Sequence, residues 1–147
     1  PTASGFTEIN RAGKINGTPE RAFPQFKASL ALGWLHKSFD VTLTTRYIHS
    51  LTEPCVELSD FPTTCSDFSE VAPDMNSTNH LDPTLYNDIQ VLWAPDFERG
   101  LTVTAGVNNL LNRDPPACFS CSLNGFNGQT YDVPGIFGYL SATYHVQ

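Results

Sequence analysis

The four cysteines of the chain carry the chemistry that spacing defines most directly. They lie in two close pairs, Cys55 with Cys65 and Cys118 with Cys121. Close pairs in loop-like sequence favour local disulfides in an oxidising compartment, and cross-loop pairing, a metal site or free thiols are the alternatives. The spacing of Cys118 and Cys121 is also that of redox motifs. These two residues do not open a helix after a strand, however, so a redox role is disfavoured.

Other residues with useful chemistry are scattered along the chain. The four histidines lie far apart: His36, His49, His80 and His145. This scatter predicts no shared metal site. No nucleophile, base and acid occur at close spacing, so we predict no catalytic residue, no metal, no cofactor and no enzymatic activity. Arg46, Asp88 and Asn108 are the candidate ligand contacts, because the strand pattern described next places all three on one polar face.

Five segments alternate apolar and polar residues with the period of two that is typical of β-strands. They are Gln25–His36, Phe39–Leu51, Thr84–Ala94, Leu101–Leu110 and Ile136–Gln147. A tight turn at Lys37–Ser38 is expected to join the first two into a hairpin. The same alternation places the charged residues of the strands on the face opposite the apolar one. These residues are Lys27, Asp40, Arg46 and Asp88.

The connections between these segments are alternately short and long. Thr52–Asp82 and Leu111–Gly135 far exceed the usual connection length, whereas Lys37–Ser38 and Pro95–Gly100 are short. Outer-membrane barrels alternate in this way, with short periplasmic turns and long outer loops. The first long loop is acidic, and we interpret it as a solvated surface, with a cation or cationic ligand as the alternative. Its acidic residues include Glu53, Glu57, Asp60, Asp67, Glu70 and Asp74.

The aromatic residues fit two girdles at the interfaces of a membrane. The expected short-turn girdle contains Trp34, Phe39, Trp93, Phe97 and Tyr144. The expected long-loop girdle contains Tyr47, Tyr86, Phe137 and Tyr139. The alternative is that these side chains fill the core of a β-sandwich. Residues 1–24 are polar and are predicted to form a loop, with a strand at Phe6–Asn10 as the alternative.

The composition excludes one class of partner. The chain has 147 residues and a formal net charge of −7, with 8 Lys and Arg against 15 Asp and Glu. Nucleic acid is excluded, because phosphate contacts need clustered Lys and Arg. No apolar run approaches the roughly 20 residues of a membrane helix, but strands of a barrel need only about 9–11 residues each.

Four segments together carry the pattern of a known family. Val107–Pro116 reads VNNLLNRDPP, and Tyr131–Gly135 reads YDVPG before an aromatic-rich last strand. Phe23–Lys27 leads into a strand with Trp34, and Thr45–Ile48 reads TRYI. These segments resemble the C-terminal end of the β-barrel of TonB-dependent outer-membrane receptors, most closely the family's NNLFD-x-PP and closing patterns. The resemblance covers about Gly13–Gln147 and is strongest after Gly106.

The chain departs from this family at two positions near its end. Ile136 stands where the family usually has a basic residue. Such barrels usually end on an aromatic residue, whereas this sequence ends on Gln147. An aromatic residue at the next position would share a face with Tyr144 and Val146, so we expect that one terminal residue is missing.

The resemblance implies an all-β fold, an antiparallel transmembrane β-barrel segment with about five to six C-terminal strands of a barrel of about 22 strands. Residues 1–147 would be a C-terminal fragment, with the plug domain absent from this chain. The implied function is active uptake of a scarce nutrient across the bacterial outer membrane, energised by the TonB system. The implied ligands are ferric siderophores or other iron complexes, haem, cobalamin and oligosaccharides.

The resemblance also implies the partners of the chain. They are the remaining barrel strands and plug of the same receptor, the TonB complex through the N-terminal part, outer-membrane lipid and an extracellular small-molecule ligand. Two rival hypotheses remain. A soluble secreted β-sandwich that binds carbohydrate would explain the aromatic residues, acidity and disulfides. A small complete barrel, which could be an enzyme, would need about eight strands.

Overall fold

The computed structural model describes residues 10–17, 20–55, 65–67, 77–121 and 125–146. These residues form β-strands and connections, without a helix. The strands are β1 Lys14–Gly17, β2 Glu20–Phe23, β3 Lys27–His36, β4 Phe39–Ile48, β5 Leu51–Pro54, β6 Thr78–Leu81, β7 Thr84–Trp93, β8 Leu101–Asn108 and β9 Phe137–Tyr144. Within these ranges, no helix of a length and hydropathy suited to crossing a membrane occurs.

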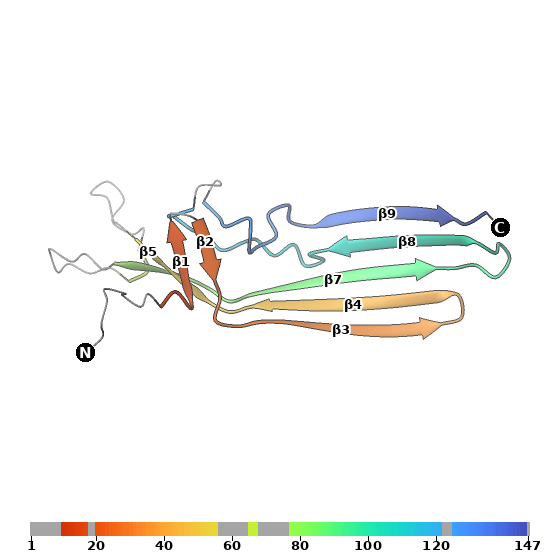
Figure 1. Ribbon diagram of the computed structural model, residues 1–147, viewed down its shortest axis with the longest axis horizontal. Coiled ribbons are helices and arrows are strands. Elements are labelled where there is room, and N and C mark those ends of the chain that lie inside the picture. Colours follow the sequence, from red (N-terminus) through yellow and green to blue (C-terminus); the bar gives the residue numbers. More distant parts are fainter. Residues whose placement is uncertain (1–9, 18–19, 56–64, 68–76, 122–124, 147) are drawn as a thin grey trace, which may run out of the picture.

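A five-stranded antiparallel sheet, the large sheet, contains the strands predicted from alternation. Its order is β3-β4-β7-β8-β9, and the strands lie side by side in Figure 1. The predicted hairpin is confirmed, because His36 pairs with Phe39 around Lys37–Ser38. Lys37 takes the positive φ of 52° that this two-residue turn requires. The short turns lie at the end of the sheet where β9 ends, and the long connections lie at the other end (Figure 1).

The register of the large sheet separates apolar from charged side chains. Paired residues point to the same side of a sheet, so the row Leu32, Leu43, Ile89 and Val107 belongs to one face. We call this the apolar face and the opposite one the polar face. On the apolar face the five strands carry no Asp, Glu, Lys or Arg. The prediction that Lys27, Asp40, Arg46 and Asp88 share the opposite face is confirmed.

The apolar face is uncovered by the described part of the chain. Leu30, Leu32 and Trp34 of β3 are each about 60% exposed, and Leu140 of β9 is 76% exposed. The outer edges of β3 and β9 pair with none of the described strands, so the sheet is open and does not close into a barrel. The large sheet therefore has no hydrophobic core of its own on this side.

A second, four-stranded sheet corrects the prediction of two loops. β1 and β2 occupy the region 1–24 predicted as a loop, and β5 and β6 occupy the ends of the predicted loop Thr52–Asp82. Their order is β2-β1-β5-β6, and β1 meets β5 in parallel through Lys14 and Thr52. Four-residue strands are too short to show alternation, and tertiary hydrogen bonds hold them. The Thr52 N–H, for example, donates to the Gly13 carbonyl at 2.8 Å.

The packed core lies at the long-loop end, where the small sheet meets the large one. Its buried residues are Ile15, Ile48, Leu51, Leu81, Tyr86, Cys118 and Tyr131. Ile48 and Tyr86 belong to the polar face, so this core lies on that side of the large sheet. The alternative strand at Phe6–Asn10 lies almost wholly outside the described residues, and Asn10 itself is in no strand.

The register revises one of the two expected aromatic girdles. At the short-turn end Trp34, Phe39, Trp93 and Tyr144 share the apolar face, as the girdle requires. Of the four residues expected at the long-loop end, one, Tyr47, is on that face. Tyr86, Phe137 and Tyr139 are on the polar face, and Tyr86 is fully buried. These three residues lie near the long-loop end, as expected. Their odd or even positions along the strands, however, place their side chains on the polar face.

Candidate functional site

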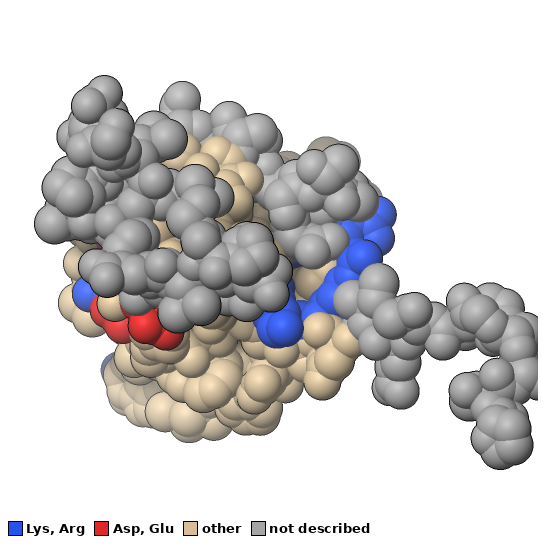
Figure 2. All heavy atoms as spheres, turned by 90° about the vertical axis from the view of Figure 1, so that its left-hand side faces the viewer, with Lys and Arg blue, Asp and Glu red and all other residues tan. Residues whose placement is uncertain are grey.

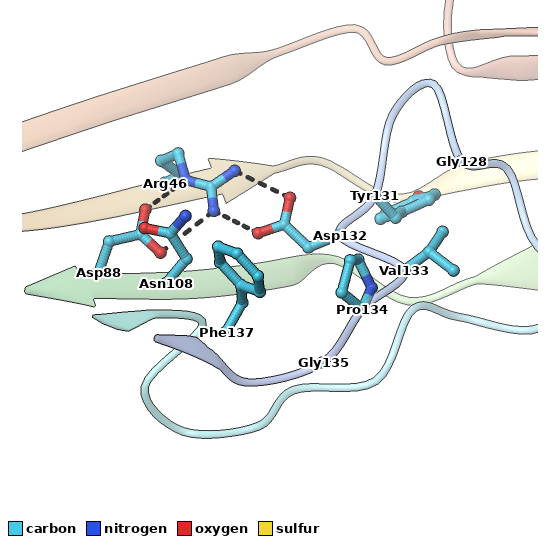
Figure 3. A pocket seen from close by; sticks show the side chains of 10 residues that line it. All are labelled: Arg46, Asp88, Asn108, Gly128, Tyr131, Asp132, Val133, Pro134, Gly135 and Phe137. Carbon is cyan, nitrogen blue, oxygen red and sulfur yellow. Dashed lines mark hydrogen bonds and ion pairs between the residues drawn. The ribbon is translucent and has the colours of Figure 1, made fainter. Parts of the chain in front are cut away.

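The three predicted ligand contacts lie around one cleft on the polar face. Arg46 comes from β4, Asp88 from β7 and Asn108 from the end of β8 (Figure 3). The cleft has a volume of about 450 Å³. Its other walls come from the connection between β8 and β9 and the start of β9, with Gly128, Tyr131, Asp132, Val133, Pro134, Gly135 and Phe137. The strand register therefore places the three residues on one face, as alternation predicted, and the structure adds that they line one cleft.

Arg46 is held between two carboxylates. Its Nε donates to Asp88 Oδ2 at 2.7 Å, and its Nη2 donates to Asp88 Oδ1 at 3.2 Å. Its Nη1 donates to Asp132 Oδ1 at 3.2 Å, and Nη2 also bonds Asp132 Oδ2. Both carboxylates thus engage the planar guanidinium in the two-pronged manner that fixes its orientation. Asp132 was not identified from sequence, because it follows no strand pattern and lies in a long connection.

A second set of contacts fixes the carboxylates and the base of the cleft. Asp88 Oδ1 accepts the Asn109 N–H at 2.8 Å, and Tyr86 Oη accepts the Asp132 N–H at 3.2 Å. The Arg46 guanidinium carbon lies 5.2 Å from the centre of the Tyr86 ring, within the range of a cation–π contact. Side chains from β4, β7 and the β8–β9 connection therefore form one network.

Asn109 explains why the segment after β8 can turn back over the sheet. It is fully buried and has a φ of 52°, a left-handed conformation that Asn tolerates better than most residues. Its side chain brackets Arg113, donating from Nδ2 to the Arg113 carbonyl at 2.9 Å and accepting the Arg113 N–H at 2.7 Å. The sequence NNLLNR thus forms a closed turn that presents its backbone N–H to Asp88.

The charged side chains of the cleft determine which ligand groups it could bind. Arg46, Asp88 and Asp132 together carry one net negative charge, and the guanidinium is already paired. The cleft therefore favours a neutral polar or cationic group over a second carboxylate. Burial, with a smaller contribution from the nearby Tyr86, raises the pKa of Tyr131 to about 12, so this wall stays neutral at ordinary pH. Among the described side chains, no three His, Cys, Asp or Glu residues are placed to hold a metal ion.

Glu53 corrects the interpretation of the first long loop as wholly solvated. It is fully buried and accepts hydrogen bonds on both oxygens. Oε1 accepts from Asn79 Nδ2 at 2.7 Å and from the Phe119 N–H at 2.8 Å. Oε2 accepts from the Ser120 N–H at 2.8 Å and from Ser120 Oγ at 2.6 Å. The Glu53 carboxylate of β5 therefore holds the β8–β9 connection to the small sheet.

Of the other acidic residues named above for that loop, the structure describes Asp67. Asp67 is exposed, as the prediction of a solvated surface requires. Glu57, Asp60, Glu70 and Asp74 lie outside the described residues. Glu53 differs from Asp67 because it lies within a strand that a neighbouring connection covers.

Both cysteine pairs form local disulfides. Cys55 bonds Cys65, and Cys118 bonds Cys121. Neither bond joins the two long connections to each other. The Cys118–Cys121 bridge flanks the residues that donate to Glu53, and Cys118 is itself part of the buried core. The Cys118–Cys121 disulfide therefore belongs to the packed core at the long-loop end.

Comparison with known proteins identifies no relative. The chain matches no protein-family model, no curated protein and no solved structure. The function is therefore inferred from the sheet, the cleft and the sequence pattern of the chain itself.

Proposed function

We propose that this chain forms wall strands and outer loops of a TonB-dependent receptor of the bacterial outer membrane. The observation that carries the proposal is the apolar face. Across five strands it holds no charged residue, it is exposed, and nothing in the described chain covers it. A soluble protein rarely leaves so large an apolar surface in water, whereas a bilayer provides its natural cover.

The dimensions of the strands support a membrane location. β3, β4 and β7 each contain 10 residues, which matches the roughly 9–11 residues of a tilted transmembrane strand. Trp34, Phe39, Trp93 and Tyr144 then mark the interface at the short-turn end. The alternation of short turns and long connections agrees with an arrangement that has the turns in the periplasm and the loops outside.

The open edges of the sheet support a larger barrel. In lipid, each unpaired backbone group costs several kcal/mol, so the outer edges of β3 and β9 need partners. In the proposed receptor these partners are the remaining strands of a barrel of about 22, which surrounds a plug domain. Energy would reach the receptor through contact between its N-terminal part and the TonB complex.

The cleft supports uptake of a small molecule. It lies on the polar face, which would be the wet interior, and the β8–β9 connection folds over it. A ligand captured by the outer loops would meet Asn108, Phe137 and the Arg46 network as it enters. The ligand class is a scarce nutrient, such as an iron complex, haem, cobalamin or an oligosaccharide.

The test is the state of the intact protein in its source cells. An antibody against residues 111–135 should detect it in purified outer membranes. The band should be several times larger than the 16.2 kDa of this chain, and it should shift on heating, as folded barrels do. A soluble band would refute the proposal and favour the secreted β-sandwich, for which binding to immobilised glycans would be tested next.

A further inference from the structure

The buried carboxylate of Glu53 also contacts the second disulfide. Its Oε2 atom lies 3.0 Å from Cys118 Sγ, and the two residues are 0% and 1% exposed. A disulfide sulfur carries no hydrogen, so in the oxidised protein this contact is not a hydrogen bond. Glu53 does not need one there, because Asn79, Phe119 and Ser120 already supply four donors. The close approach of the two atoms therefore adds no hydrogen bond while the disulfide is closed.

Reduction of the disulfide would turn this contact into a hydrogen bond. The Cys118 sulfur then carries a hydrogen, and the Glu53 oxygen already lies within reach of that S–H group. A hydrogen bond to a charged acceptor contributes more than a hydrogen bond between neutral groups. A buried thiol that had no acceptor would lack this contribution. Glu53 thus stabilises the dithiol form of the pair relative to the disulfide form.

The backbone around the two cysteines is held by bonds that do not involve sulfur. Glu53 accepts the N–H groups of Phe119 and Ser120, which lie between the cysteines. The Cys118 N–H donates to the Gly125 carbonyl at 2.7 Å. Breaking the sulfur–sulfur bond leaves these contacts in place, so two thiols that are three positions apart stay close enough to join again. Reduction at this site is therefore expected to be reversible.

We propose that Cys118–Cys121 is a reversible disulfide that exchanges with an external dithiol. A thiolate of the dithiol attacks the sulfur of Cys121, the less buried residue of the pair, and Cys118 leaves and takes up a proton. The second thiolate of the dithiol then attacks the external sulfur of this mixed disulfide, and Cys121 leaves and takes up a proton. The protein gains two electrons and two protons, and the dithiol becomes a disulfide. An external disulfide reverses each step.

The test measures how readily each disulfide opens in the intact, folded protein. The probe is a series of mixtures of reduced and oxidised dithiothreitol. Figure 2 views the long-loop end, where uncharged residues form most of the visible described surface, so an uncharged reagent is suitable. Acid quenching, alkylation with N-ethylmaleimide and peptide mass spectrometry give the open fraction of each pair. Cys118–Cys121 should open without faster proteolysis of residues 111–135, and it should close again when the mixture is made oxidising.

Glu53→Gln distinguishes an acceptor for the thiol from a mere anchor of the connection. With a neutral acceptor, Cys118–Cys121 should need a reduced-to-oxidised ratio about fivefold higher to open, which is the difference between a charged and a neutral hydrogen bond. An anchor alone predicts the opposite sign, because a looser connection opens more easily. Ser120→Ala is the matched control: it removes the 2.6 Å bond from Ser120 Oγ but keeps the carboxylate, so its opening ratio should be no higher than that of the parent. Cys55–Cys65, measured in the same samples, is the internal reference.

Three results would overturn the proposal. An opening ratio in Glu53→Gln that is equal to or lower than that of the parent would show that Glu53 only anchors the connection. In the parent, a pair that opens only on unfolding, or that does not close again, would show a structural brace. Faster proteolysis of the connection in the reduced parent would show the same, and these measurements need no variant. The proposal does not depend on the membrane location, so a protein found in the soluble fraction would refute the proposed receptor and leave these outcomes unchanged.

Discussion

An arginine at position 43 tests which face of the large sheet meets lipid. Leu43 is the fifth of ten residues in β4, and it lies between Leu32 of β3 and Ile89 of β7 in the middle of the apolar face. An arginine at the midplane of a bilayer costs about 2–4 kcal/mol in a barrel strand. Leu43→Arg should therefore lower the folded-to-unfolded ratio by about 30- to 900-fold. On a water-exposed surface the same change would cost less than about 0.5 kcal/mol.

Two control variants make this prediction specific. Thr42→Arg introduces the same charge at the neighbouring position on the polar face, where water is expected, and should cost less than about 0.5 kcal/mol. Ala28→Arg is on the apolar face near the long-loop end, and should cost only about 0–1 kcal/mol because the penalty falls with distance from the midplane. If lipid covers the apolar face, the cost of an arginine should fall from the middle of that face toward its end.

The assay is denaturant unfolding of the intact protein in lipid vesicles, followed by tryptophan fluorescence. Trp34 and Trp93 both lie on the apolar face, so their emission should report the loss of contact with lipid. Equal costs for Leu43→Arg and Thr42→Arg would refute the assignment of the two faces. A large cost at both Leu43 and Ala28, in a protein that stays in solution, would instead indicate a covering protein layer.

Three further predictions concern the long-loop end. Glu53→Gln should destabilise the β8–β9 connection by about 2–3 kcal/mol, because the new amide NH2 would face the N–H of Ser120 or Phe119 and could not accept from it. Faster proteolysis of that connection would show this destabilisation. Asp132→Asn should weaken the contact with Arg46 by about 1–3 kcal/mol and speed cleavage of the same connection, whereas Asp114→Asn, an exposed change, should leave the cleavage rate unaltered. Tyr131→Phe should stabilise the protein by about 1 kcal/mol, because the buried Tyr131 hydroxyl has no hydrogen-bond partner in the described structure. Because burial raises the pKa of Tyr131, the folded state opposes its ionisation, and the free energy of unfolding should fall as pH rises from 10 toward 12; thermal unfolding of the parent, but not of the phenylalanine variant, should show this fall. Unchanged proteolysis in the first two variants, or a parallel alkaline loss in the third, would contradict the roles assigned to these side chains.

The sequence predicted the large sheet because its information is local and periodic. Strands of 8 or 10 residues repeat the alternation often enough to define both their extent and their facing. The same parity then placed Arg46, Asp88 and Asn108 on one surface, and pairing between neighbouring strands brought them to one cleft. Alternation with a period of two is therefore enough to predict which side chains share a site when all of them lie within strands.

The parts that the sequence did not predict depend on contacts between distant segments. β1 and β5 are four-residue strands that meet in parallel, and no local pattern encodes that pairing. Asp132 belongs to a connection, so its approach to Arg46 follows from the path of the chain after Asn109. Glu53 has the composition of a solvated loop residue, and only the cover provided by Phe119 and Ser120 makes it a buried acceptor.

The two disulfides differ from the other contacts that stabilise the long-loop end, because they join residues close together in the sequence. Each closes within one connection, over a sequence separation of 10 for Cys55–Cys65 and 3 for Cys118–Cys121. Oxidation can therefore be completed in the extended chain without choosing which strands become neighbours. In the described structure, hydrogen bonds to Glu53 of β5 and ion pairs of Arg46 of β4 hold the β8–β9 connection to the sheets, and these contacts form only when the strands have paired. Strand order thus stays correctable throughout assembly, and no thiol exchange is needed to repair a misplaced hairpin.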